Sequence, residues 1–167
     1  MILLPPEKIG DQIIELIENS TKILLIISPY CEFINWDRLK TALTRAHRRG
    51  IPIRFFTRAQ WRAEDNPSID WLEDTGIDVY SIKNLHAKLY MNESSAILTS
   101  LNLLHYSAIY SLEIGVQTQD INLIKQLHKE YYHLLFEKSK PVTYYNLTFS
   151  SDIPSILDIF PDWPFDI

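Results

Sequence analysis

Apolar residues recur along this chain with two periods, one typical of helices and one typical of strands. Residues 7–19 place isoleucine and leucine on one helical face. Residues 36–49 repeat the helical period, with Trp36 and Leu43 facing inward and basic residues facing outward. Between them, residues 22–28 read KILLIIS, a continuous apolar run that is typical of a strand covered on both faces. The first 49 residues therefore predict a helix, a strand and a second helix.

The same two periods continue beyond Gly50, which supplies a helix stop signal, as does Gly76 further on. The further predicted strands are residues 51–57, 77–82, 85–91, 95–99 and 111–118, the further predicted helices are residues 68–75 and 121–136, and a turn is predicted at residues 92–94. The buried stripe expected of the last helix is Ile121, Ile124, Leu127, Tyr131, Leu134 and Leu135. Helices and strands alternate early and strands cluster later, so we expect an α/β fold in which helices flank a mixed β-sheet.

Composition supports one globular domain. The chain has 167 residues, of which 46% are hydrophobic and 22% charged, and this balance is not that of a disordered protein. We expect residues 1–140 to form the domain and residues 141–167, which are aromatic, acidic and proline-bearing, to form an appendage packed on the domain or on a dimer partner.

The expected environment is the cytoplasm, without stable membrane association. No apolar run approaches the roughly 20 residues that cross a bilayer. The apolar start of the chain is interrupted by Pro5 and Pro6 and has no basic flank, unlike a secretory signal. Cys31 is the only cysteine, which excludes an internal disulfide and a cysteine-based zinc site. We expect no metal and no cofactor.

Charge is distributed unevenly. The formal net charge is −5, which argues against tight nonspecific binding to nucleic acid. Residues 38–62, however, contain eight lysines and arginines and no acidic residue. The basic residues at the end of the second helix also have a structural explanation that needs no ligand, because cations there complement the helix dipole and face water. Binding residues are more plausible just after predicted strands, where α/β sheets place ligands. We expect substrate contacts from Arg58, Trp61, Arg62 and Tyr30, since arginine binds phosphate and an indole stacks on bases.

The candidate chemistry lies between residues 85 and 115. His86 and Lys88 are two apart on a predicted strand and so share a face. Ser100 and Asn102 follow the strand that returns through a short turn, and Glu113 lies on the next predicted strand. These groups suit attack on a phosphodiester: a histidine nucleophile divides the reaction into two steps, and lysine and asparagine stabilise the developing charge. A second histidine must protonate the leaving oxygen.

This segment resembles the signature of the phospholipase D superfamily: H-x-K, four residues, D, and later G-S-x-N. The resemblance implies that His86 is the nucleophile or the acid, that Lys88 and Asn102 bind the phosphate, and that Ser100 is a supporting hydrogen-bonding residue. Glu113 falls where nuclease members of the family often place an acid that supports the histidine.

Three positions depart from that signature. Glu93 replaces the aspartate, Thr99 replaces the glycine before the serine, and the turn is one residue shorter. Because the family aspartate mainly organises the local structure, we expect these changes to alter the hairpin more than the chemistry. Glu93 is therefore not counted as catalytic.

Family enzymes combine two copies of the motif in one active site, and this chain has one copy. None of the other histidines is followed by lysine two residues later. A two-fold homodimer would place His86 opposite its own copy, and the two imidazoles would titrate as a coupled pair.

We therefore expect a metal-independent phosphodiesterase, a nuclease that works through a phosphohistidine in a homodimer, with DNA favoured over RNA. Two alternatives remain open. A phospholipid hydrolase or phosphatidyltransferase should show an interfacial apolar surface. A catalytically silent nucleic-acid-binding module should bind without cleavage, even after His86→Ala.

Overall fold

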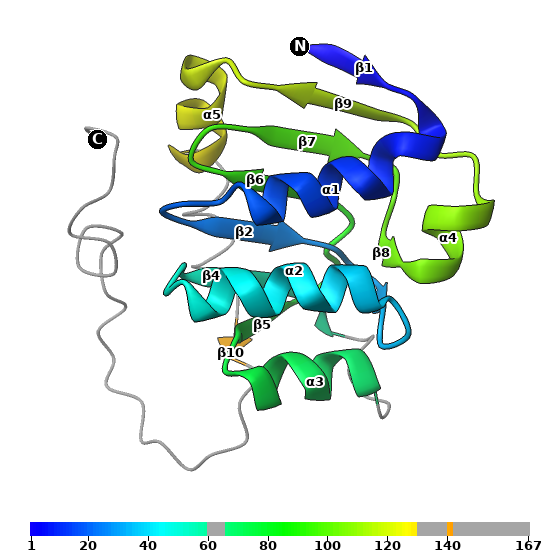
Figure 1. Cartoon of the computed structure of the whole chain (residues 1–167), viewed down its shortest axis with the longest axis vertical. Coiled ribbons are helices and arrows are strands. Elements are labelled where there is room, and N and C mark those ends of the chain that lie inside the picture. Colours follow the sequence, from blue (N-terminus) through cyan, green and yellow to red (C-terminus); the bar gives the residue numbers. More distant parts are fainter. Residues whose placement is uncertain (60–65, 130–139, 142–167) are drawn as a thin grey trace.

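The computed structural model describes residues 1–59, 66–129 and 140–141 (Figure 1). The strands are β1 (Ile2–Leu4), β2 (Leu24–Ile27), β3 (Cys31–Glu32), β4 (Ile53–Arg58), β5 (Asp78–Ile82), β6 (Leu89–Asn92), β7 (Ala96–Thr99), β8 (Leu103–Leu104), β9 (Gly115–Thr118) and β10 (Lys140–Pro141). The helices are η1 (Pro6–Lys8), α1 (Ile9–Glu18), α2 (Asp37–Arg48), α3 (Pro67–Thr75), α4 (His105–Tyr110) and α5 (Ile121–Leu127). Of the appendage expected at residues 141–167, all but Pro141 lies outside the described residues.

Eight strands form one mixed sheet in the order β1-β9-β7-β6-β2-β4-β5-β10. The pairs β2–β4 and β4–β5 are parallel, because α2 and α3 carry the chain back between them, and the other neighbours are antiparallel. The short strands β3 and β8 form a separate parallel pair. The predicted α/β fold with a mixed sheet flanked by helices is confirmed.

Helices cover both faces of the sheet. The helices α1, α2 and α3 lie side by side on one face (Figure 1), over a core that includes Ile26, Phe55 and Tyr90. On the other face, Ile27 packs in a second cluster that includes Leu127 of α5. The two faces of β2 are therefore both buried, as its uninterrupted apolar sequence predicts. Each fully buried large side chain contributes about 1.5–3 kcal/mol through removal from water.

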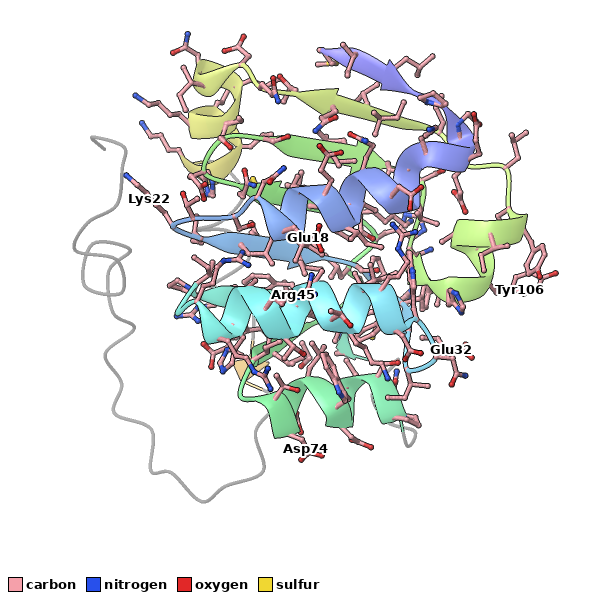
Figure 2. The ribbon with its side chains drawn as sticks, viewed as in Figure 1. Glu18, Lys22, Glu32, Arg45, Asp74 and Tyr106 are labelled. Carbon is pink, nitrogen blue, oxygen red and sulfur yellow. The ribbon has the colours of Figure 1, made fainter. Side chains whose placement is uncertain are left out.

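Basic side chains of α2 tie this helix to α1. Arg38 pairs with Asp11, and Arg45 pairs with Glu18 across the helix interface (Figure 2). The guanidinium of Arg49 donates to the carbonyls of Glu18 and Ser20 at the end of α1. Carbonyls at a helix end lack partners within the helix, so this arginine satisfies them. Part of the basic run is thus explained by packing between helices.

The ends of the helices follow the predicted signals. Gly50 after α2 and Gly76 after α3 both have positive φ, 79° and 85°. Asn66 caps the start of α3, where its side-chain oxygen accepts from the backbone of Ser68 and Ile69. The limits of α3 are thereby set by local sequence.

The structure corrects the sequence prediction in the second half of the chain. The strand predicted at residues 85–91 begins only at Leu89, so the H-x-K segment precedes it. The strand predicted at residues 111–118 is confined to β9, because the residues before it form α4 and a connecting loop. The unpredicted β1 pairs with β9 and is the outermost strand on that side of the sheet.

The last predicted helix is confirmed in its first turns as α5. Ile124 and Leu127 are buried there, but Ile121 is 44% exposed and so does not belong to the buried stripe. Residues 130–136 of this predicted helix, with the rest of its expected stripe, lie outside the described residues.

Candidate active site

The strand directions bring the predicted site segments together at the carboxyl ends of β2, β4 and β7. We call this end of the sheet the site edge. Strands β2, β4 and β7 end at this edge, and the antiparallel strands β6 and β9 begin there. It is the edge toward which the arrows of β2 and β7 point in Figure 1. The predicted site residues that flank these strand ends are Tyr30, Arg58, His86, Lys88, Ser100, Asn102 and Glu113. Segments far apart in sequence therefore converge in one place.

The H-x-K segment is held between two buried leucines. Leu85 and Leu89 are both buried in the second core cluster, so the three residues between them are restrained at each end. The carbonyl of Lys88 also accepts a hydrogen bond from the backbone of Thr99 at 3.4 Å. The imidazole of His86 is exposed, while Lys88 is half-buried. This arrangement leaves the side chain of His86 accessible to a substrate, two residues from the half-buried Lys88.

Ser100 is bound to the loop that precedes β9. Its hydroxyl donates to the carboxylate of Glu113 and accepts from the backbone of Ile114 at 3.0 Å. The backbone of Ser100 also donates to the carbonyl of Ile114 at 2.9 Å. Among the described residues, no hydrogen bond joins Glu113 to His86, so the expected support of the histidine by Glu113 stays a prediction.

Asn102 carries a buried polar atom that lacks a partner. Its side-chain oxygen is removed from solvent and accepts no hydrogen bond from any described residue. An unsatisfied buried acceptor costs about 1–3 kcal/mol, so such atoms need an explanation. A group that donates to this oxygen would remove the cost, whereas the side-chain NH2 of Asn102 is the group that could bind a phosphate oxygen.

Two residues that the sequence analysis did not single out hold the Asn102 loop in place. The fully buried Tyr90 hydroxyl donates to the carbonyl of Leu101 at 3.0 Å, and burial raises the pKa of this phenol. The hydroxyl of Ser28 accepts from the backbone of Leu103 at 2.8 Å. Tyr90 lies two residues after Lys88, so the alternation of strand faces was a signal that pointed to it. Ser28 gave no comparable signal.

Tyr30 and Arg58 meet at the ends of β2 and β4. The guanidinium of Arg58 donates to the Tyr30 hydroxyl at 2.8 Å and lies 6.0 Å from the centre of its ring. Both side chains are half-buried. The tyrosine thus restrains the arginine at the edge that carries His86. Trp61 and Arg62, the other expected substrate contacts, lie outside the described residues.

Glu93 lies at the opposite edge of the sheet, in the turn between β6 and β7. Its carboxylate accepts from the hydroxyl and backbone of Thr21 and from the backbone of Lys22 and Ile23. Burial raises the pKa of Glu93, but these hydrogen bonds outweigh burial and hold the pKa below its ordinary value. The residue therefore organises the turn and is remote from the site.

The described residues show neither a cluster of metal ligands nor a membrane-spanning helix. Within residues 1–59, 66–129 and 140–141, no three histidine, cysteine or acidic side chains gather as a metal site would require. No helix in the same ranges has the length and apolar character to span a bilayer. His105, which follows the motif, stacks on Trp36.

Comparisons with known proteins give a consistent family. The family model described as "Cardiolipin synthase, PLD-like domain" matches residues 13–135. No curated protein matches the chain. Among solved structures, the phospholipase D family member Nuc from Salmonella typhimurium is similar, with a TM-score of 0.68 and 13% identity over 83% of this chain and 93% of that chain.

Two further structures share the fold. NucT from Helicobacter pylori has a TM-score of 0.71 and 18% identity, over 84% of this chain and 96% of that chain. The archaeal chromatin protein TrmBL2, whose structure is described as showing a novel mode of DNA binding, has a TM-score of 0.62 and 16% identity, over 84% of this chain and 52% of that chain. Identities this low establish a common fold and leave the activity to the site residues.

Proposed function

Because the chain belongs to the phospholipase D superfamily, we propose that it is a metal-independent phosphodiesterase that cleaves nucleic acid through a phosphohistidine. The observation that carries the proposal is the meeting of His86, Lys88 and Asn102 at one sheet edge, with the histidine exposed. Residues that match the family motif one by one are thus on segments that the fold brings together.

In the proposed reaction, one imidazole nitrogen of His86 attacks the phosphorus and the P–O bond to the leaving alcohol breaks. The ammonium of Lys88 and the amide of Asn102 donate to the non-bridging oxygens and stabilise their growing charge. A second, protonated imidazole gives its proton to the leaving oxygen. Water then cleaves the P–N bond, that second imidazole takes the proton of the water, and the phosphate monoester leaves.

The second imidazole is proposed to be the partner's His86. The chain carries one H-x-K motif, and a two-fold axis near the edge would place the two copies face to face. His86 of one copy would then be the nucleophile and the partner's His86 the acid, and the two imidazoles must differ in protonation in the active form.

Nucleic acid is the favoured substrate class. Arg58 offers a cation at the site edge, where a phosphate backbone would pass. The chain also spans most of Nuc and NucT, and one structural neighbour is described as binding DNA. We favour DNA over RNA because the nucleic acid named for that neighbour is DNA.

A phospholipid substrate is the second candidate, because one observation favours it. Apolar side chains of α4 and the loop after it, such as Tyr106 and Leu112, are exposed beside the site. An exposed apolar surface was the feature expected of a lipid enzyme, and the matching family model is described by a cardiolipin synthase. Residues 101–124, however, contain no lysine or arginine to attract anionic headgroups.

The deciding experiment is cleavage of labelled single- and double-stranded DNA and RNA in EDTA, with phospholipid vesicles in parallel. We expect the native protein to cleave a nucleic acid and His86→Ala to be inactive. His47→Ala, near the end of α2 and next to Gly76, is the matched control and should keep activity. Cleavage only of lipid would favour the second candidate. Binding of nucleic acid without cleavage by native protein would indicate a silent module.

A further inference from the structure

A group of exposed apolar side chains adjoins the site. We call it the α4 surface: Tyr106, Ile109, Tyr110, Leu112 and Ile114, whose side chains are 56–90% exposed. Helix α4 packs inward through Ala108 and His105, which lie against Gly10 and Trp36. The opposite side of the helix therefore faces outward, and Figure 2 shows Tyr106 pointing away from the body of the chain.

The α4 surface adjoins the site edge, where the predicted site residues lie. Leu112 and Ile114 flank Glu113, whose carboxylate accepts the Ser100 hydroxyl. The backbone of Ile114 pairs with Ser100 in both directions. Anything that covers this surface therefore lies beside the proposed reacting groups.

We infer that the α4 surface is the contact through which a second copy of this chain completes the active site. The inference rests on the proposed function, because one copy supplies a single H-x-K motif. An isologous contact that borders the site would bring the partner's His86 to the same edge, which a contact on the helices α1, α2 and α3 would not.

Charge favours a protein partner over the alternatives. Residues 101–124 contain no lysine or arginine, and their acidic residues are Glu113 and Asp120. A nucleic acid or an anionic bilayer would meet no cation here. Interface centres are instead depleted in charge and enriched in aromatic side chains. The α4 surface contains two tyrosines, Tyr106 and Tyr110, whose ring centres are 4.8 Å apart.

The size of the surface is also adequate. An aromatic side chain buries about 150–250 Å² and an aliphatic one somewhat less, so five such side chains at these exposures offer on the order of 600 Å². Two copies would together bury roughly 1,200 Å², which is within the range of specific interfaces. The site edge between the two copies would add to this area.

The test replaces two exposed residues of the full chain, Tyr110→Lys with Leu112→Lys. The matched control is Ile2→Lys with Leu3→Lys, which puts the same two charges on two exposed apolar residues of β1. In sedimentation equilibrium, the native protein and the control should be dimers at micromolar concentration. The double variant should dissociate, with the dimer Kd raised about 100-fold or more, because charge is placed in a desolvated interface. Its circular dichroism should match that of the native protein.

Activity separates this inference from the proposed function. Because the variant keeps every catalytic group, its cleavage should fall at low protein concentration and recover as the concentration rises. A variant that remains dimeric would overturn the α4 surface as the interface while leaving the histidine mechanism intact. A monomeric variant with native activity per chain would instead remove the two-histidine mechanism.

Vesicles of phosphatidylcholine with phosphatidylglycerol test the rival occupant. The inference expects no binding by the native protein. A monomeric native protein that binds the vesicles and loses this binding in the double variant would show that the surface meets a bilayer, and would overturn the dimer contact.

Discussion

Thr99 lies directly opposite Gly115 in the antiparallel pair of β7 and β9. The hydroxyl of Thr99 donates to the carbonyl of Ile114 at 2.7 Å and accepts from the backbone of Leu101 at 3.0 Å. A Cβ added at Gly115 would lie 3.2 Å from that hydroxyl and 3.2 Å from the end of Ile9. The chain has Thr99 where the family motif has glycine, and the residue opposite it on β9 is a glycine, which leaves room for the threonine side chain.

Gly115→Ala should destabilise the protein by about 1–2 kcal/mol, because the added methyl group crowds Thr99 and Ile9. In a Thr99→Gly background the added cost should be smaller, since one of the two crowded neighbours is gone. Urea unfolding of the four proteins in this double-mutant cycle gives the coupling, which we expect to exceed about 0.5 kcal/mol. Additive effects would show that the two residues do not constrain each other.

Lys88→Ala should reduce turnover by about 100-fold or more, since a donor to the transition-state charge is removed. Stability should change by less than about 1 kcal/mol, because the ammonium pairs with no other described residue and is half-buried. Cleavage rates and urea unfolding measure the two effects. Lys83→Ala, an exposed lysine nearby, is the control and should alter neither. Equal losses of turnover and stability would identify Lys88 as a structural residue.

Replacing Arg58 and Arg62 together by alanine should weaken nucleic-acid binding and flatten its dependence on salt, by about one unit of log–log slope per lost phosphate contact. Tyr30→Phe should have a smaller effect in the same direction, because it removes the hydroxyl that holds Arg58 but keeps the ring. Fluorescence anisotropy over a salt series measures the slope. Arg45→Ala on the exposed side of α2 is the control, and an unchanged slope in the double variant would exclude Arg58 and Arg62 as phosphate contacts.

Glu93→Gln should lower stability at pH 7 by about 1–3 kcal/mol, because hydrogen bonds to a charged acceptor are weakened. The pKa of Glu93 lies below its ordinary value of 4.5 in the folded protein. Its charged form therefore stabilises the fold above about pH 4.5, and that contribution is lost as the pH falls through the lowered pKa. Urea unfolding from pH 7 to pH 3 should show the gap between native protein and variant closing on acidification. A gap independent of pH would mean that the charge of Glu93 does not matter.

Much of the fold was predictable because its signals are local. The apolar run of β2, the helical stripe of α2 and the capping glycine after α3 each act within a few residues, and each prediction is confirmed. The prediction was wrong at residues 111–114, where the spacing of Leu112 and Ile114 resembles a strand. Both side chains are exposed instead, because the chain there leaves the sheet to form α4 and its loop.

The candidate site, like the fold, was predictable from sequence only in part. Sequence alone determined the family and the motif residues His86, Lys88, Ser100 and Asn102, since their identity and spacing are properties of one short segment. Only the tertiary structure decided what surrounds that segment. The Tyr30–Arg58 contact joins residues 28 apart, and the Ser28–Leu103 hydrogen bond joins residues 75 apart. Such contacts depend on the order and direction of the strands, which no local periodicity records.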